Sequence, residues 1–550
     1  MLASMSNIRA VGKTSFQAGH KVVCPESQKS DFLSIIPGRT QVSEGGIHPV
    51  FEIFRRYYVY LIVTAFLALL IGTRAQHLVG SIDNPHAWRQ SDTAWYAYSF
   101  YKDGINILKP SVCWMGGHKT VILEFPFPEV LMALAYEALG HHLYLARLIT
   151  LIFFAGSAIY LFLIVRKLAD SRLAVIATGV YVVLPLSLFY SRAVHIDFFA
   201  VFFAHAMFFH LLRALSFPRF RDIFLAVVAG SFAFLVKAPY AFYFMLPLLC
   251  VAMQQRCPLR SLIWLGGCLL IPCLLFVWWR SHAATVNAAM PDWSFIPEYF
   301  KFTEMGSWYY GPWEARLNIH HWRRLWGRFG NDVTSSVGMW LFITGLAVSL
   351  MAAFRGSWRK WLPLWIWFSS VLVYVVIFFN LNLVHDYYQI PFLAVSSVFV
   401  ALGIDAPRRI LRRRLRKTEA IISFVLFGMI SFNSITYARD TYFKRDVLRE
   451  QFGEIIRQST PDEALVIATP NVGTDCRDPS SLFCARRNGW SIDRHNLSRD
   501  LVERLKKVGA SHLAVMVNDT DSLEQIKAYG YTIHLYPIDD NWQVLIANLV

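Results

Sequence analysis

Long apolar runs recur along the chain and constrain its fold more than any other feature. Between residues 57 and 437 they follow one another in stretches of about 17 to 20 residues, the length of a membrane-spanning helix. Only 16% of the 550 residues are charged, whereas soluble domains average about 25%. Because lipid satisfies no backbone hydrogen bonds, spanning segments of this kind must be helical. The sequence therefore predicts a polytopic α-helical membrane protein.

The number and direction of the spans follow from the apolar runs and the basic turns between them. We predict about 11 transmembrane helices. They are 57–75, 145–165, 173–190, 198–213, 223–236, 240–253, 262–279, 338–354, 362–380, 390–404 and 420–437. Basic clusters such as Arg408–Lys417 fall in alternate loops, which the positive-inside rule assigns to the cytoplasm. The loops 76–144 and 280–337 are then extracytoplasmic. The apolar segment 124–140 is short and carries two prolines, so we expect it to be re-entrant or interfacial.

Three parts of the chain differ in composition. Residues 1–56 are polar and are expected to form a cytoplasmic tail, and 57–437 form the transmembrane module. From 438 to 550, apolar strand patterns alternate with polar helix patterns, which predicts a small extracytoplasmic α/β domain. Cys476 and Cys484 flank a turn there, and a local disulfide and two free thiols are both open.

The basic charge of the chain does not indicate a nucleic-acid partner. The formal net charge is +16, but the positive residues are mostly clustered beside apolar runs, as expected of a membrane protein. We therefore expect membrane lipids and no nucleic acid among its partners. No glycine-rich phosphate-binding motif is present in the C-terminal part, so nucleotide binding is not expected either.

The loop after the first span concentrates ionisable and aromatic side chains. Residues 81–98 hold Asp83, His86, Arg89 and Asp92, and the positions after Asp92 have helical spacing. An amphipathic helix here is expected to lie in the membrane interface, with Asp92 near the lipid headgroups. The same composition is also typical of an ordinary juxtamembrane loop with an aromatic belt. These residues alone leave both interpretations open.

Further ionisable groups are expected at the outer ends of the spans. The full set is Asp83, His86, Arg89, Asp92, Lys119, Glu124, Arg192, His195, Asp197, Lys237, His385 and Asp386. Charges at membrane depth usually face a cavity or a functional path. A single one, such as Lys237, is more often a snorkelling charge. Because five separate loops deliver the set to one face, its clustering favours a reaction centre.

The order of short motifs along the chain adds to this interpretation. Asp92 is followed one helical turn later by Tyr96-Ala97. The other motifs are, in order, Gly104…Pro110, Glu124-Phe-Pro-Phe-Pro, Ala146-Arg147-Leu148, Ser191-Arg192…Asp197 and His385-Asp-Tyr-Tyr388. This order resembles the C-type (GT-C) integral-membrane glycosyltransferases, in the branch of the protein mannosyltransferases and aminoarabinose transferases (family 39-like). Two positions depart from the family: Phe125 replaces a motif lysine, and Thr93 replaces the second residue of a carboxylate pair.

The resemblance implies transfer of a sugar from a polyprenyl-phosphate donor to an acceptor glycan, lipid or protein, outside a bacterial inner membrane. Asp92 is expected to act as general base, with inversion at the anomeric carbon. Glu124 and Asp197 complete the catalytic set and are expected to orient the acceptor or the cations. The expected substrate-binding residues are Asp83, His86, Arg89, Tyr96, Arg192, His195, Lys237, His385, Asp386 and Tyr387. Among them, the cations Arg89, Arg192 and Lys237 are expected to stabilise the departing phosphate.

Three alternatives stay open at this point. The histidines His86, His195 and His385 offer metal ligands, but no spacing between them demands a metal, so none is assigned. The same charges suit a transporter path, although transporters often show internal repeats and none is evident here. A polysaccharide ligase also uses a lipid-linked donor, but the motif order does not match one.

Overall fold

The computed structural model describes residues 64–75, 78–410, 416–470 and 474–550. The predicted tail 1–56 and the start of the first span lie outside these residues, whereas 64–72 are helical. The long helices of the bundle are α4 (Leu143–Leu168), α5 (Ser171–Val183), α7 (Asp197–Ser216), α8 (Phe220–Lys237), α10 (Met245–Gln254), α11 (Leu259–Ala288), α14 (Ser336–Ala352), α15 (Trp358–Ile377), α17 (Ile390–Ile404) and α19 (Arg416–Thr441). Short helices α6 (Pro185–Tyr190), α9 (Pro239–Phe242), α16 (Phe379–Val384) and α18 (Ala406–Ile410) join some of them. Over its described residues, each span expected from the sequence therefore coincides with a helix or a pair of helices.

The expected number of about 11 spans is supported in part. Among the described residues, six helical stretches are long and apolar enough to cross a membrane. They are Leu143–Leu168, Asp197–Ser216, Leu259–Ala288, Ser336–Ile377, Asp386–Ile404 and Thr418–Thr441. The fourth is broken at Gly356 (φ 92°), so it contains both α14 and α15, joined by the turn η4 (Ala353–Ser357). The apolar helical stretches Ser171–Val183 and Pro239–Gln254 are shorter than these six, and each overlaps an expected span.

The bundle is packed around two helices that are buried along most of their length. α7 packs against α4 and α8, and α17 packs against α5 and α14. Glycines allow the α14–α17 contact: a Cβ atom on Gly345 would lie 1.8 Å from the Phe399 carbonyl oxygen, and one on Gly403 would lie 2.0 Å from that of Leu341. Small residues at such crossings let two backbones approach closely, which is how helices associate in lipid.

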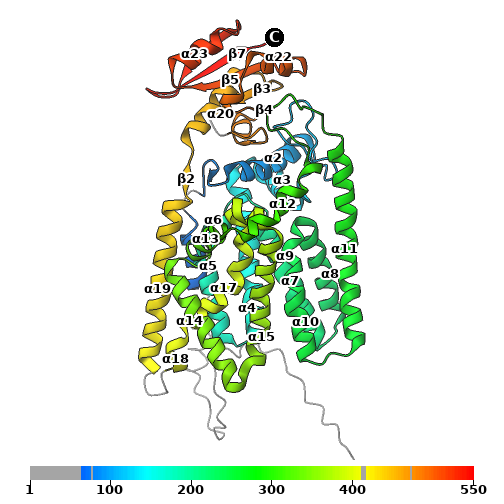
Figure 1. Cartoon of the computed structure of the whole chain (residues 1–550), viewed down its shortest axis with the longest axis vertical. Coiled ribbons are helices and arrows are strands. Elements are labelled where there is room, and N and C mark those ends of the chain that lie inside the picture. Colours follow the sequence, from blue (N-terminus) through cyan, green and yellow to red (C-terminus); the bar gives the residue numbers. More distant parts are fainter. Residues whose placement is uncertain (1–63, 76–77, 411–415, 471–473) are drawn as a thin grey trace, which may run out of the picture. The chain divides into compact units, whose positions relative to one another are not determined.

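Two helices lie across the outer ends of the bundle. They are α2 (Ala87–Asp103) and α3 (Phe127–Leu139), which pack against each other and run crosswise to the long helices (Figure 1). α3 has 13 residues and spans about 20 Å, too short for a hydrocarbon core of about 30 Å. Segment 124–140 therefore does not cross the membrane. The interfacial position expected for α2 is wrong in one respect: 12 of its 17 residues are buried, because the C-terminal domain and α3 cover it.

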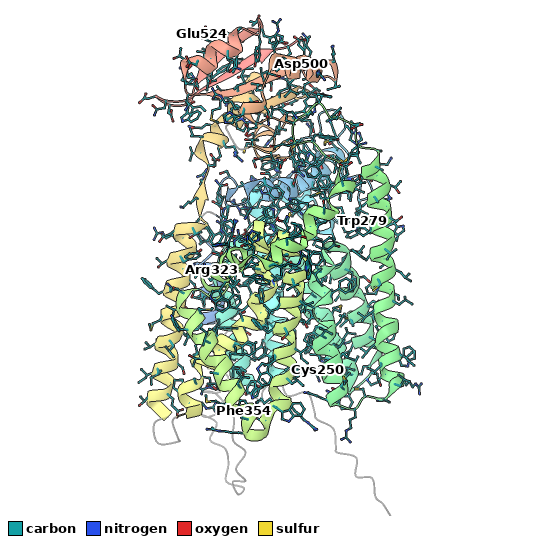
Figure 2. The ribbon with its side chains drawn as sticks, in the orientation of Figure 1. Cys250, Trp279, Arg323, Phe354, Asp500 and Glu524 are labelled. Atoms are coloured by element: carbon teal, nitrogen blue, oxygen red, sulfur yellow. The ribbon has the colours of Figure 1, made fainter. Side chains whose placement is uncertain are left out.

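The long loop 280–337 is folded into short helices. These are η1 (Phe302–Glu304), α12 (Gly306–Tyr310), η2 (Trp313–Leu317), α13 (Ile319–Arg328) and η3 (Phe329–Val333). The short helix η5 (Asp386–Gln389), with the sequence DYYQ, follows α16 and directly precedes α17. The bundle end far from the sheet carries Phe354 (Figure 2), followed by Arg355, Arg359 and Lys360.

The C-terminal part is a mixed five-stranded sheet with helices around it. Its strands are β3 (Leu465–Thr469), β4 (Asn488–Ser491), β5 (His512–Val517), β6 (Thr532–Pro537) and β7 (Gln543–Asn548), in the order β4-β3-β5-β7-β6. Its helices are α20 (Val447–Ser459), α21 (Ser480–Ala485), α22 (Arg499–Lys507) and α23 (Thr520–Lys527), with the short turn η7 (Arg494–Asn496). β4, β3 and β5 are parallel, whereas β7 and β6 continue antiparallel. The buried strand faces form one core around Ile467 and Leu513. This agrees with the small α/β domain expected from the sequence.

Two backbone pairings fasten this domain to the first outer loop. β1 (Asp83–Asn84) pairs antiparallel with β2 (Lys444–Arg445) at the end of α19. At the edge of the sheet, the Gly116 amide donates to the Gly489 carbonyl (2.7 Å), and the Gly489 amide donates to the Cys113 carbonyl (2.8 Å). Loop 111–120 thus covers the edge strand β4, which would otherwise present unpaired groups.

The cysteines of the C-terminal domain are unpaired. Cys476 and Cys484 are free thiols in the structure, so the local disulfide that the sequence left open is not formed. Burial raises the pKa of both thiols to about 12, which leaves them protonated and unreactive at neutral pH.

Candidate active site

Asp92 is a buried carboxylate in the N-terminal half of α2. Its side chain is 5% exposed, and Trp114 Nε1 donates a hydrogen bond to Asp92 Oδ1 at 3.0 Å. Arg89, one turn earlier, places Nη1 4.0 Å from Asp92 Oδ2. Burial raises the pKa of Asp92 to about 7, although the Arg89 charge and the Trp114 hydrogen bond act in the opposite direction. A carboxylate poised near neutral pH can both accept and release a proton.

Arg89 connects Asp92 to Glu124. Arg89 Nη2 lies 2.6 Å from Glu124 Oε2, at the segment that leads into α3. Tyr96, a second residue of α2, fixes this segment, because its hydroxyl donates to the Val121 carbonyl and accepts from the Leu123 amide. Tyr96 is thus a positioning residue for Glu124.

A second group lies where α7 begins and α8 ends. Lys237 Nζ donates to Asp197 Oδ1 at 2.7 Å, and the Tyr240 hydroxyl donates to the same oxygen. His195 Nδ1 lies 2.6 Å from Asp197 Oδ2. Asp197 is fully buried, so three neighbours are needed to compensate its charge.

A third group is built on η5 and on the residue before α2. His86 Nε2 lies 3.1 Å from Asp386 Oδ1, which also accepts from the Tyr190 hydroxyl at 2.6 Å. His385 is buried, and neither of its ring nitrogens has a hydrogen-bond partner among the described residues. Its ring lies between aromatic neighbours, with Trp88 at 5.5 Å and Trp308 at 5.8 Å between centroids.

Tyr387 joins the second and third groups. Its ring centroid lies 4.8 Å from that of His195 and 5.2 Å from that of His86. Lys237 Nζ lies 5.2 Å from the same centroid and 4.3 Å from that of Tyr388, so two tyrosine faces bear on one ammonium. The expected cluster therefore forms: residues from the first outer loop, α7, α8 and η5 gather around one aromatic hub.

Asp83 and Arg192 occupy a separate, buried ion network. Arg192 Nη2 lies 2.6 Å from Asp83 Oδ2, and Arg147 Nη2 lies 3.6 Å from the same oxygen. Arg192 also lies over the Phe443 ring at 4.6 Å. Both Asp83 and Arg192 are fully buried, and the network ties β1 to α4 and to the segment before α7. This geometry gives the pair a structural role and turns Arg192 away from the phosphate contact that we expected of it.

Sequence reasoning missed two residues of the site. Trp114 follows Asp92 by more than 20 positions, and only the docking of loop 111–120 on β4 brings them together. Tyr240 had a detectable signal, because it stands three residues after Lys237, on the next helical turn. Among the described residues, no three His, Cys, Asp or Glu side chains are grouped as metal ligands would be.

Comparison with known proteins relates the chain to membrane glycosyltransferases. Residues 124–279 match the model of the dolichyl-phosphate-mannose-protein mannosyltransferase family. No curated protein sequence matches the chain. The crystal structure of ArnT from Cupriavidus metallidurans bound to undecaprenyl phosphate is similar with a TM-score of 0.56 at 13% identity, over 90% of this chain and 98% of that one. The oligosaccharyltransferase of Archaeoglobus fulgidus, in complex with Zn and sulfate, is similar with a TM-score of 0.53 at 12% identity, over 87% of this chain and 72% of that one.

These matches confirm the resemblance predicted from the motifs. At identities this low the solved structures establish the fold, which is that of the C-type membrane glycosyltransferases. The family match supplies the enzyme class, a membrane glycosyltransferase related to the protein mannosyltransferases. It covers Glu124, Asp197 and Lys237, whereas Asp92 lies before it.

Proposed function

We propose that the chain transfers a sugar from a polyprenyl-phosphate-linked donor to a hydroxyl or amine of a cell-envelope acceptor, on the outer face of a bacterial inner membrane. The observation that carries the proposal is the buried Asp92 carboxylate, which lies 4.0 Å from Arg89 and whose pKa is raised by burial to about 7. The family match and the undecaprenyl phosphate in the ArnT structure support a polyprenyl-linked donor.

The proposed reaction is a single displacement at the anomeric carbon. Asp92 accepts the proton of the acceptor hydroxyl while the acceptor oxygen forms the new glycosidic bond. The bond between the anomeric carbon and the phosphate oxygen breaks on the opposite face, so the configuration inverts. The electron pair leaves with the lipid, which departs as a polyprenyl phosphate monoester. Asp92, protonated at the end of the step, returns its proton to water.

The departing phosphate gains negative charge, and two cations are placed to stabilise it. They are Arg89 and Lys237, each already oriented by a carboxylate, Glu124 for Arg89 and Asp197 for Lys237. Held in this way, they need little rearrangement as charge develops, which is the condition for electrostatic stabilisation of a transition state. Because Phe125 stands where the family carries a lysine, position 125 offers no cation for this task.

The sugar is proposed to lie against the third group. The two unpartnered nitrogens of His385 supply one donor and one acceptor, which suits a sugar hydroxyl. Trp88 and Trp308 flank the ring and offer the flat faces on which sugar rings pack. His86, held by Asp386, is a second hydrogen-bonding group at the same place.

The direction of the chain in the membrane supports an outward-facing site. Phe354 lies at the bundle end opposite the sheet (Figure 2), and Arg355, Arg359 and Lys360 follow it in the sequence. The positive-inside rule assigns that end to the cytoplasm. α2, α3 and the C-terminal domain are then extracytoplasmic, where donor lipids and envelope acceptors meet.

The test is sugar transfer in proteoliposomes. A panel of radiolabelled polyprenyl-phosphate sugars is supplied with envelope extract as acceptor, and the full chain is compared with Asp92→Asn. We expect transfer to fall about a hundredfold or more, because a general base contributes about 10²–10⁴ to the rate. The matched control is Asp103→Asn, the exposed carboxylate at the end of the same helix, which should keep full activity.

The outcomes separate the alternatives. Equal transfer by wild type and a folded Asp92→Asn protein would remove Asp92 from the reaction and leave Glu124 as the next base to test. No transfer with any donor would refute the proposal and return attention to solute transport.

A further inference from the structure

A cavity of about 370 Å³ lies between the transmembrane module and the C-terminal domain. Its walls come from the start of the first outer loop, the C-terminal half of α2, the turn between α3 and α4, and helices α20 and α21. Its lining includes Ser81, Tyr98, His141, Tyr144, Glu450 and Arg486. None of them belongs to the three groups of the candidate active site, so the cavity is distinct from the proposed reaction centre.

Arg486 is the uncompensated charge of this cavity. Among the described residues no carboxylate lies within ion-pair distance of its guanidinium, whose hydrogen bond is to His141 Nδ1 at 3.4 Å. The residue also has a left-handed backbone (φ 54°), at the position where α21 ends. Glycine or asparagine is normally found at such a position, since other side chains are strained there. An arginine in that conformation is uncommon, which draws attention to the contacts of its side chain.

The backbone of Arg486 is held in place by its neighbour. Arg487 is buried, donates to the Thr460 carbonyl at 2.7 Å and lies 2.9 Å from Asp462 Oδ1. Arg487 is held against the C-terminal domain just before β4 begins. Its neighbour Arg486 therefore points the other way, toward the cavity that it lines.

His141 prepares the guanidinium for a ligand. Burial, together with the charges of Arg486 and His142, lowers the pKa of His141 to about 4. The ring is therefore neutral at pH 7, and Nδ1 accepts the hydrogen bond from Arg486. Tyr98 lies under the same guanidinium, 5.6 Å from it, and packs edge-on against His141 at 4.9 Å. A neutral imidazole and an aromatic face orient the cation without neutralising it.

The acidic residue of the cavity is already neutralised. Glu450 lies 2.8 Å from Arg445 Nη2 and accepts a hydrogen bond from the Ser81 hydroxyl. The cavity thus carries one net positive charge, from Arg486, beside aromatic rings. Tyr144, stacked on His142 at 5.3 Å, adds a further flat face.

We propose that this cavity binds the anionic end of a saccharide acceptor. Arg486 holds a phosphate or carboxylate of the acceptor, and Tyr98 and Tyr144 pack against its sugar ring. This inference rests on the proposed function and names the acceptor class as an anionic glycan. Arginine is suited to this ligand because its fork binds phosphate and carboxylate through two parallel hydrogen bonds.

The position of the cavity relative to Asp92 fits an acceptor site. Tyr98 follows Asp92 by six residues on α2, a rise of about 9 Å. A glycan of a few sugars anchored at Arg486 can therefore present a more distant hydroxyl group to Asp92. The cavity also lies next to the start of α4, at the membrane surface, where lipid-linked glycans present their headgroups.

The experiment measures binding apart from turnover. The full chain carrying Asp92→Asn is placed in phosphatidylcholine nanodiscs, and lactose 1-phosphate and lactose are titrated by calorimetry. We expect binding of the phosphorylated sugar only. Arg486→Gln should weaken it about tenfold or more, and Arg486→Lys should retain most of it. Arg499→Gln, an exposed arginine of the same domain, is the matched control and should change nothing.

A second arm identifies the source of the anion. Nanodiscs containing phosphatidylglycerol are analysed by native mass spectrometry. Retention of phosphatidylglycerol that is lost in Arg486→Gln would show that a lipid headgroup supplies the anionic group, whereas retention of lactose 1-phosphate alone would point to the glycan. If Arg486→Gln matches the control with both probes, the acceptor site is refuted. The proposed transferase function would then still stand or fall by the Asp92→Asn assay.

Discussion

Asp92 owes its proton affinity to a few neighbours, and one of them can be removed cleanly. The Trp114 indole N–H stabilises the ionised carboxylate, whereas burial opposes ionisation more strongly. The base form predominates only above the pKa of about 7. Transfer should therefore rise with pH between about 6 and 8 and then level off, because only the ionised carboxylate accepts a proton.

Removing that indole gives a signed prediction. Trp114→Phe deletes the hydrogen bond that lowers the pKa of Asp92, so the rising limb of the pH–rate profile should move to higher pH. Transfer at pH 7 falls, and transfer well above the new pKa recovers in part. Trp95→Phe is the control, because the Trp95 Nε1 atom is buried without a hydrogen-bond partner among the described residues. An unchanged pH–rate profile in Trp114→Phe would mean that the ionisation of a group other than Asp92 determines the rising limb.

At the scale of single residues, the sequence predicted which residues cluster better than it predicted which of them contact one another. Lys237, Asp197 and Tyr387 lie together as expected. Asp83 and Arg192 instead neutralise each other in the interior. Charge type and span end can be read from a sequence, but which acid meets which base depends on helix packing that no local pattern encodes.

At the scale of elements, apolar periodicity located the helices, and glycine spacing decides how closely two of them approach. The crossing of α14 and α17 leaves no space for a side chain at Gly345. The amphipathic pattern of α2 suggested an interfacial helix, and no local pattern indicated that α3 and α21 would cover it.

The α14–α17 crossing can be tested by one methyl group. Gly345→Ala should destabilise the protein by about 1–3 kcal/mol, because the new Cβ atom would overlap the Phe399 carbonyl. The expected observation is a lower melting temperature in detergent by scanning fluorimetry. Gly266→Ala, on the open face of α11 with nothing within 4 Å, is the matched control and should keep the wild-type melting temperature.

At the scale of the whole molecule, the C-terminal domain contributes to the reaction centre through loop 111–120. β4 holds loop 111–120, and that loop holds Trp114 against Asp92. Gly116 makes the docking possible: its φ is 51°, and a Cβ atom there would lie 2.1 Å from the Trp490 ring. The change of composition near residue 438 was visible in the sequence, but this connection was not.

Disturbing the docking should therefore change chemistry at a distance. Gly116→Ala should loosen the domain, seen as faster amide exchange in β4, and should shift the pH–rate profile in the direction of Trp114→Phe. Gly117→Ala is the control, because a Cβ atom there makes only an ordinary 3.8 Å contact with Leu465. Looser exchange with an unchanged profile would separate the domain from the base.

The pairing of loop 111–120 with β4 also limits how this enzyme can be re-engineered. Exchanging the C-terminal domain for that of a relative is an obvious way to alter acceptor choice, but the replacement must bring a free strand edge with room for Gly116. A chimera without that edge would express, insert and bind lipid, and yet lack a correctly adjusted base. Successful swaps should therefore be those in which the loop and the domain are moved together.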